Sequence, residues 1–399
     1  MISVNRLLEE LVARDVSLIA GVPCSYLTSL INATLANPNL HYIPSSSEGE
    51  ALAISAGAWL SGRIGVTMQQ NSGLGNIVNP LTSLSTTFKI PSLLFITWRG
   101  EPGKPDEPQH KLMGQITPDL LTLMEIPWSH LPTKDNKLSA SLDVAFKHMQ
   151  QERKPYVFLI RKGDIESSPR NKAILTDSQK IEKKRLLPSS LSLTHSQKSN
   201  SVLPSRVEAL RLFLNTISIH SPVIATTGKC GRELFTLTDE KRNLYCVGSM
   251  GYANAIAHGI ALVSSRTIYV LDGDGALLMH MGNLATIGAA GTKNLVHVLL
   301  DNAAYDTTGG QPTVSKSIDF VRIASACGYK NVISCSHLND FEKALNQKNI
   351  HGPRFIHIHI RKGSLENLGR PTISPDKVAK RFRQFMLDIP ISDISKKLA

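Results

Sequence analysis

Two oxygen-bearing side chains in the C-terminal half of the chain stand at the ends of apolar runs. Asp274 lies between the glycines Gly273 and Gly275, and Asn302 stands at the end of a second run. Both runs have the β-branched and aromatic content that is typical of buried strands. If the two strands are parallel neighbours, both side chains lie at their carboxyl ends, where flanking glycines let a ligand approach the backbone. Such an oxygen pair beside a phosphate-binding turn suits a Mg²⁺ ion that holds a diphosphate.

The residues after the first run support the same interpretation. A helix is expected from about Ala276, and its first N–H groups would face an anion. A Gly-Asp-Gly sequence alone is more often a simple turn. A strand before it, a helix after it and a second strand ending at Asn302 make a ligand site the stronger interpretation.

The order of these residues resembles the motif with which thiamin-dependent enzymes bind thiamin diphosphate. The resemblance implies thiamin diphosphate and Mg²⁺ as cofactors, with metal ligands from Asp274, Asn302 and the main-chain carbonyl of Ala304. The chain has Asp301 where the motif usually has its first asparagine. The residues that the resemblance assigns to the cofactor are Glu48, Gly248, Met250, Gly273, Asp274, Gly275, Ala276 and Asn302.

A carboxylate in the N-terminal half is the second candidate. Glu48 precedes an Ala-rich helical segment, where a helix N-terminus stabilises negative charge. This segment alone is equally consistent with helix capping by Glu48 or Glu50. The spacing of Glu48 and Gly57 resembles that of the catalytic glutamate in thiamin enzymes, which implies that Glu48 hydrogen-bonds the aminopyrimidine ring and promotes formation of the reactive carbanion. Glu50 does not match this spacing and is expected on the helix surface.

A glycine loop before another Ala-rich segment is the third candidate. Gly248-Ser-Met-Gly251 follows an apolar run, and by itself it predicts only a turn. The resemblance implies that Met250 supports the bent cofactor and that the Gly248 carbonyl accepts a hydrogen bond from the aminopyrimidine. Methionine is well suited to filling such an irregular gap.

Longer strings narrow the resemblance. Residues 70–76, 98–103, 106–110 and 309–313 resemble the phosphonopyruvate decarboxylases, and the sulfopyruvate decarboxylases share part of the pattern. The implied activity is the non-oxidative decarboxylation of 3-phosphonopyruvate to phosphonoacetaldehyde and CO₂, within phosphonate biosynthesis. Sulfopyruvate or another anionic 2-oxo acid is the alternative substrate. A non-catalytic thiamin-binding homologue is disfavoured because the glutamate and both metal-binding side chains are present.

A small anionic 2-oxo acid needs cations or clustered donors in its pocket. His110 lies in a polar loop rich in Gly and Pro, where functional residues are often carried. Because imidazole titrates near neutral pH, His110 is the candidate for proton transfer. The alternative for each polar residue is simple contact with solvent. The candidate substrate contacts are Ser25, Asn71, Ser72, Arg99 and Tyr305.

Four positions depart from the family pattern. Cys24 stands where Asp is usual, Tyr305 where His is common, Asp301 in place of an Asn, and Cys230 in place of a Thr or similar residue. Because Cys24 and Tyr305 stand where the substrate is expected, the resemblance leaves the choice of 2-oxo acid open.

Helical and strand-like patterns alternate in residues 1–168 and again in residues 205–366. The strings 155–163 and 353–363 are alike and stand at equivalent ends of these halves, which favours a duplicated unit. We therefore predict an α/β protein with two related, doubly wound parallel-sheet domains and no middle domain. The resemblance implies that the first domain binds the pyrimidine and the second the diphosphate and Mg²⁺.

Two further segments complete the predicted organisation. Residues 169–204 are basic and Ser-rich and are predicted to be an inter-domain linker. Residues 367–399 are predicted to be a tail with a basic amphipathic helix from about Pro375 to Leu387, which serves packing or oligomer formation.

Composition excludes several classes of protein. The chain has 399 residues, of which 42% are hydrophobic and 19% charged, as in soluble globular proteins. No apolar run is long enough for a membrane span. The five cysteines form no Cys-x-x-Cys pair, which argues against structural disulfides, zinc and the iron–sulfur clusters of a ferredoxin-linked oxidoreductase. A reducing cytoplasm fits this pattern.

The net charge of +12 raises the question of nucleic-acid binding. Much of the excess lies in the linker, and no basic and aromatic recognition motif accompanies it, so no nucleic-acid partner is expected. No Gly-x-Gly-x-x-Gly follows a strand, which argues against a nicotinamide site. The resemblance implies a homodimer or homotetramer with the active site at the subunit interface, because the glutamate and the diphosphate site come from different subunits.

Overall fold

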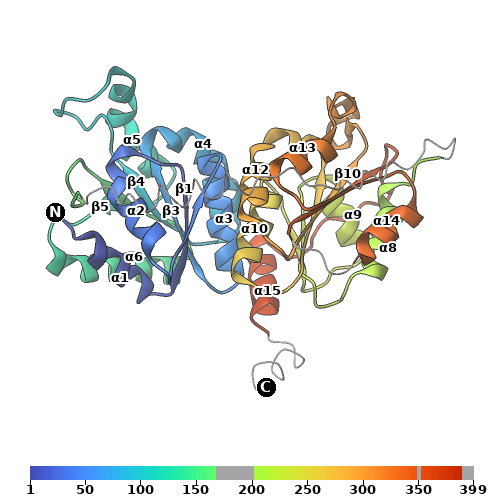
Figure 1. The fold of residues 1–399 in the computed structure, drawn as a ribbon, viewed down its shortest axis with the longest axis horizontal. Helices are drawn as coiled ribbons and strands as arrows, with labels where there is room; N and C mark the ends of the chain where they lie inside the picture. Colours follow the sequence, from blue (N-terminus) through green and yellow to red (C-terminus); the bar gives the residue numbers. More distant parts are fainter. Residues whose placement is uncertain (168–201, 348–351, 389–399) are drawn as a thin grey trace. The chain divides into compact units, whose positions relative to one another are not determined.

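The structure is a computed structural model that describes residues 1–167, 202–347 and 352–388. The chain forms two compact units, which are Met1–Trp59 with Arg63–Ser189 and Leu60–Gly62 with Ser190–Ala399. Each unit holds one six-stranded sheet with helices packed against it (Figure 1).

The strands of the first unit are all parallel and lie in the order β2-β1-β3-β4-β6-β5. The strands are β1 (Val16–Gly21), β2 (His41–Pro44), β3 (Ile64–Gln70), β4 (Leu93–Thr97), β5 (Trp128–His130) and β6 (Tyr156–Ile160). The helices are α1 (Val4–Val12), α2 (Thr28–Ala36), α3 (Glu48–Leu60), α4 (Leu74–Pro80), α5 (Lys111–Leu123) and α6 (Asp135–Glu152). Short helical turns are η1 (Ser25–Leu27), η2 (Asn71–Gly73), η3 (Leu81–Thr86) and η4 (Pro108–His110).

Alternate residues of these strands face opposite helical layers, as the period of two in a β-strand requires. In β4, Leu93 and Phe95 belong to the hydrophobic cluster that includes residues of α1, α2 and α6. Leu94 and Ile96 belong to the cluster that includes residues of α3, α4 and α5. All four side chains are fully buried. Burial on both faces explains why the strands are almost continuously apolar in sequence.

The second unit has a parallel sheet in the order β13-β14-β10-β9-β7-β8. The strands are β7 (Val223–Ala225), β8 (Asn243–Tyr245), β9 (Ile268–Gly273), β10 (Leu295–Asp301), β13 (Asn331–Cys335) and β14 (Arg354–His359). The helices are α8 (Arg206–Thr216), α9 (Lys229–Leu237), α10 (Ala253–Val263), α11 (Asp274–Met279), α12 (Gly282–Ala290), α13 (Phe320–Cys327), α14 (Leu338–Asn346) and α15 (Pro375–Leu387). A small antiparallel pair, β11 (Ala304–Tyr305) with β12 (Gln311–Pro312), and the turns η5 (Asp306–Thr308) and η6 (Ser315–Ser317) follow β10.

Both sheets have the same strand order when each unit's strands are counted from its own first strand and the small antiparallel pair is left out. In each, the first strand lies between the second and third, and the sixth lies between the fourth and fifth. The similar strings near residues 155 and 353 fall on β6 and β14, which occupy equivalent places. The prediction of two related, doubly wound α/β units is confirmed. In such sheets the strand order reverses next to the first strand, and ligands bind at the carboxyl ends there.

The predicted tail helix from Pro375 to Leu387 is α15. It contacts β8 of its own unit, and Arg381 forms an ion pair with Asp239 at 2.6 Å. The predicted linker, 169–204, lies almost wholly outside the described residues, so the domain boundaries at 168 and 204 stay predictions.

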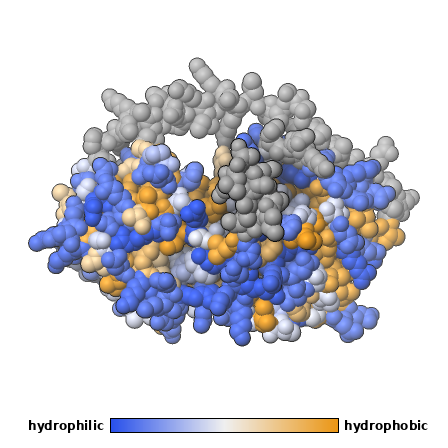
Figure 2. Space-filling model, turned by 90° about the horizontal axis from the view of Figure 1, so that it is seen from below, coloured by the Kyte–Doolittle hydropathy of each residue, from blue (hydrophilic) through white to orange (hydrophobic). Residues whose placement is uncertain are grey.

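No helix in the described ranges has the length and apolar character that a membrane crossing requires. The molecular face drawn in Figure 2 is largely hydrophilic, with smaller hydrophobic patches between hydrophilic residues. The cytoplasm as the location of the protein stays a prediction.

A buried histidine in α10 predicts how stability depends on pH. His258 is fully buried, neither ring nitrogen has a hydrogen-bond partner in the described structure, and burial lowers its pKa to about 3. In the unfolded chain this histidine has its ordinary pKa of 6.5 and binds a proton below that pH, whereas in the folded chain it stays neutral down to about pH 3. The free energy of unfolding is therefore retained above pH 6.5 and falls as the pH drops towards 3. We expect a loss of about 2 kcal/mol between pH 7.5 and pH 5 from this residue.

Calorimetric melting of wild type and His258→Leu at pH 7.5 and pH 5 measures this loss. The wild type should lose about 4–8 °C more in Tm than the variant on acidification. The exposed His220, changed to Gln, is the matched control and should behave as wild type. Equal losses in wild type and His258→Leu would contradict the assignment.

Candidate active site

The carboxyl ends of β9 and β10 lie side by side. The two strands are parallel neighbours, and their register pairs Gly273 with Leu300. Asp274 and Asn302 therefore follow directly from adjacent strand ends, as the sequence predicts. Helix α11 begins at Asp274 and not near Ala276, so the predicted start was two residues late.

A cavity of about 210 Å³ opens at these strand ends, and we call it the cation cleft. It lies where the strand order reverses, because β7 and β9 both end in it. The predicted site residues that line it are Met250, Gly273, Asp274, Gly275, Ala276, Asn302, Ala304 and Tyr305. Gly248 belongs to the same loop as Met250 but does not line the cleft.

The sequence analysis missed the contribution of β7 to this cleft. Thr226, Thr227 and Gly228 form the turn between β7 and α9, and they line the cleft together with Lys229, the first residue of α9. Their position directly after a short apolar run, with a glycine before a helix, was a signal that could have identified them.

Asp274 is a buried carboxylate without a cationic partner in the described part of the chain. Its side chain is 2% exposed and accepts a hydrogen bond from Thr313 Oγ1. Burial raises the pKa of Asp274 to about 6. A carboxylate in this setting is stabilised by a nearby cation, so the residue fits a divalent metal ion.

Asn302 is fixed by its neighbours. Its Oδ1 accepts a hydrogen bond from the Ala304 N–H at 3.1 Å, and its Nδ2 donates to Asp306 at 2.7 Å. Asp306 is itself paired with Arg206 at 2.8 Å. The amide of Asn302 is therefore held at the cleft without help from a ligand.

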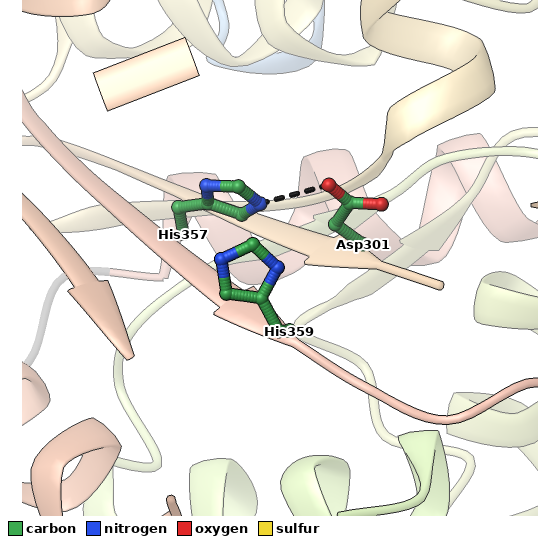
Figure 3. Close-up of side chains that lie close together, drawn as sticks. All are labelled: Asp301, His357 and His359. Carbon is green, nitrogen blue, oxygen red and sulfur yellow. Dashed lines mark hydrogen bonds and ion pairs between the residues drawn. The ribbon is translucent and has the colours of Figure 1, made fainter. Parts of the chain in front are cut away.

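Asp301 anchors the turn that carries Asn302. It accepts hydrogen bonds from Ser315, from His357 Nε2 at 2.9 Å and from the Ala303 N–H at 2.8 Å. Burial alone would raise the pKa of Asp301, but the bonds from His357 and Ser315 lower it overall. Figure 3 shows this carboxylate against His357, with the His359 ring close by.

The three side chains in Figure 3 have the residue types of a metal site, with ligand atoms within 4.8 Å of one another. The oxygens of Asp301 already accept from three donors, however, so the cluster is complete as a hydrogen-bonded anchor. One short segment links both acids, because Thr313 donates to Asp274 and Ser315 donates to Asp301.

Two features of the cleft fit a diphosphate. Thr226 Oγ1 is buried without a hydrogen-bond partner in the described structure. Helix α9 begins at Lys229 after Gly228, with no side chain capping its first N–H groups. An anion with several oxygens would satisfy the free hydroxyl and the free N–H groups.

Glu48 is the first residue of α3 in the first unit. Its Oε2 accepts a hydrogen bond from Asn76 Nδ2 at 2.7 Å. Gly73 lies directly against it, since a Cβ at that position would be 2.6 Å from Oε1. The absence of a side chain at Gly73 therefore makes room for the glutamate.

The expectation that Glu50 lies on the helix surface was wrong. Glu50 is fully buried, and it accepts hydrogen bonds from the Ser46 N–H at 2.6 Å and from Ser46 Oγ at 2.8 Å. It holds the turn that leads into α3, which is a helix-capping role. Glu48 does not take part in this capping.

The other candidate residues of the first unit meet at the carboxyl ends of β1, β3 and β4. Gln70 Nε2 lies 2.8 Å from Ser72 Oγ and 3.3 Å from His110 Nε2. Cys24 Sγ donates to Gln70 Oε1 at 3.3 Å. Arg99 Nη1 donates to Ser25 Oγ at 3.4 Å. The structure thus brings Ser25, Ser72, Arg99 and His110 into one polar cluster.

Asn71 differs from these residues because it is fully buried. Its Nδ2 donates to the Arg99 carbonyl at 2.8 Å and to Thr117 Oγ1 at 3.0 Å, and its Oδ1 accepts from the Arg99 N–H at 3.2 Å. These bonds tie the end of β3 to the end of β4. Contact between Asn71 and a substrate stays a prediction.

Comparisons with known proteins assign both halves of the chain. Residues 3–121 match the family described as thiamine pyrophosphate enzyme, N-terminal TPP binding domain, and residues 227–358 match its C-terminal TPP binding domain. A phosphonopyruvate decarboxylase of Streptomyces viridochromogenes is 42% identical over 391 residues, which cover 98% of this chain and 96% of that protein.

More distant relatives agree with this placement. A sulfopyruvate decarboxylase of Methanosarcina acetivorans is 28% identical over 95% of this chain and 96% of its own length. A solved structure of benzoylformate decarboxylase from Polynucleobacter necessarius has the same fold, with a TM-score of 0.69 at 13% identity over 92% of this chain and all of that one. The chain belongs to the thiamin-diphosphate-dependent enzymes, within the family of the phosphonopyruvate decarboxylases.

Proposed function

We propose that this protein decarboxylates 3-phosphonopyruvate to phosphonoacetaldehyde and CO₂, with thiamin diphosphate and Mg²⁺ as cofactors. The observation that carries the proposal is the 42% identity to a phosphonopyruvate decarboxylase over nearly the whole of both chains. The sulfopyruvate decarboxylase matches over a similar length at 28%, so sulfopyruvate is the second candidate substrate.

The cation cleft would bind the diphosphate of the cofactor together with its metal ion. The side chains of Asp274 and Asn302 and the carbonyl of Ala304 would hold the metal ion, which would neutralise the buried carboxylate. The hydroxyl of Thr226 and the first N–H groups of α9 face the diphosphate. Met250, which also lines the cleft, supports the body of the cofactor.

When bound, thiamin diphosphate supplies a nucleophilic carbon and an electron sink for the decarboxylation. With the cofactor bound, Glu48 would exchange a proton with a ring nitrogen of its aminopyrimidine. Gly73 allows the glutamate to occupy this position, and Asn76 orients it by donating to Oε2. His110 would exchange a proton with the substrate at Nε2.

The polar cluster of the first unit binds the anionic end of the substrate. Ser25 and Ser72 are exposed hydroxyl groups at strand ends, and Arg99 offers Nη1 beside Ser25. Tyr305 lies in the cation cleft and can donate a hydrogen bond there. We further propose that the protein is a homodimer or homotetramer in which Glu48 of one chain serves the cation cleft of another.

The substrate assignment predicts a preference that depends on charge. A phosphonate carries up to two negative charges and a sulfonate one, so donors and Arg99 should favour 3-phosphonopyruvate. We expect its kcat/KM, followed by CO₂ release with thiamin diphosphate and Mg²⁺, to exceed that of sulfopyruvate by at least about tenfold, or about 1.4 kcal/mol. A preference for sulfopyruvate would reassign the substrate, and no CO₂ from either would remove the proposal.

The proposed roles of Glu48 and Asp274 separate chemistry from cofactor binding. Glu48→Gln should lower kcat by about 10³-fold, because an amide cannot exchange the proton, while thiamin diphosphate still binds. Asp274→Asn should lose both activity and Mg²⁺-dependent cofactor binding, which calorimetric titration measures. An active Glu48→Gln enzyme, or unchanged cofactor binding by Asp274→Asn, would disprove the respective role.

Co-expression of these two inactive variants tests the shared site. If each site combines Glu48 of one chain with Asp274 of another, random dimers should regain about a quarter of the wild-type activity. Half of such dimers are mixed, and each mixed dimer has one intact site of two. If both residues act within one chain, the mixture stays inactive, which would contradict the shared site.

A further inference from the structure

We propose that Asp106 is a positioning residue that fixes the tautomer of His110 and the orientation of Arg99, so that Nε2 is the atom at which His110 exchanges a proton. The proposal rests on the proposed function in so far as His110 serves decarboxylation. Asp106 was not among the site residues that sequence reasoning selected.

Asp106 is the hydrogen-bond acceptor on which the loop between β4 and α5 converges. Its oxygens accept from Arg99 Nε at 2.8 Å, from the Gly100 N–H at 2.7 Å, from the Glu107 N–H at 2.8 Å and from His110 Nδ1 at 3.0 Å. The Asp106 side chain is only 8% exposed. Four residues thus donate hydrogen bonds to one carboxylate.

This carboxylate stays ionised. The hydrogen bonds from Arg99, with those from Gly100, His110 and Glu107, hold the pKa of Asp106 far below its usual range despite its burial. An ionised carboxylate only accepts hydrogen bonds, so Nδ1 of His110 must carry a proton to bond with it. In the neutral ring, Nε2 is therefore the nitrogen with the free lone pair.

The hydrogen bonds beyond His110 agree with this assignment. Gln70 Nε2, which can only donate, lies 3.3 Å from His110 Nε2. The other end of the amide, Oε1, accepts from Cys24 Sγ. Donors and acceptors therefore alternate from Asp106 through His110 and Gln70 to Cys24, in agreement with the Nδ1–H tautomer.

The same carboxylate restricts Arg99. Asp106 bonds Nε and Nη2 of the guanidinium, which leaves Nη1 directed at Ser25. The guanidinium also lies over the Tyr26 ring, 4.9 Å from its centre. Because Asp106 holds Nε and Nη2, Arg99 should reach a bound substrate through a directed hydrogen bond from Nη1.

The backbone of this loop does not depend on Asp106 alone. Gly100 has φ +71°, and a Cβ there would lie 2.1 Å from the His110 carbonyl oxygen. A Cβ at Gly114 of α5 would lie 1.7 Å from the Gly100 carbonyl oxygen. The Gly114 carbonyl also accepts a hydrogen bond from Trp98 Nε1 at 2.7 Å. These contacts should keep the loop closed in an Asp106 variant.

The test combines imidazole ¹⁵N NMR with kinetics on the full-length holoenzyme. His110→Gln identifies the His110 signals by their loss. The wild type should show neutral His110 as the Nδ1–H tautomer, and Asp106→Asn should shift it towards the Nε2–H tautomer or a mixture. We expect kcat of Asp106→Asn to fall by about 10²-fold with a change in KM of only a few-fold. Asp106→Glu, which keeps the carboxylate, should restore part of both effects.

Glu107→Gln is the matched control, because it removes one negative charge from an exposed side chain of the same loop. It should leave the His110 signals and kcat unchanged. Wild-type His110 in the Nε2–H form would overturn the proposal without any variant, as would loss of activity in Asp106→Asn with an unchanged tautomer. If the wild type decarboxylates no 2-oxo acid, the proposed function fails, while the NMR result still decides whether Asp106 fixes His110.

Discussion

The buried charge of Asp274 is the constraint on which the second unit depends. A carboxylate that is 2% exposed and has no cationic partner in the described structure is costly to keep ionised. This carboxylate lies at the end of β9, where a bound metal ion could offset the free-energy cost of its burial. Thr313 donates a hydrogen bond to Asp274, and Ser315 of the same segment donates one to Asp301. Asp301 itself fixes the turn that carries Asn302.

The repeated strand order explains why the two units divide the chemistry between them. Each sheet reverses its order next to its first strand, so polar residues that follow those strands gather at one edge. In the second unit this edge carries the residues that we propose hold a cation and a diphosphate. In the first it carries a cluster of donors and proton-exchanging groups around Gln70, His110 and Asp106. A thiamin enzyme needs both kinds of edge.

Much of this arrangement could be predicted from sequence, because it follows from local patterns. Apolar runs of strand type identified β9 and β10, and the polar residues after them identified the cation cleft. Hydrogen-bond partners were less accessible to sequence reasoning. Glu50 was placed on the surface although it is buried against Ser46, and Asp106 was overlooked because its role depends on a loop folding back on itself. Thr226 was overlooked because β7 is a strand of only three residues.

The central claim is that a divalent cation at Asp274 joins thiamin diphosphate to this chain. Isothermal titration of thiamin diphosphate into the metal-free protein, with Mg²⁺ and with a chelator, tests it most directly. The account predicts saturable binding with Mg²⁺ at one cofactor per chain, and affinity at least about 10²-fold weaker with the chelator, or about 2.7 kcal/mol. Equal affinity under both conditions would contradict the proposed metal site.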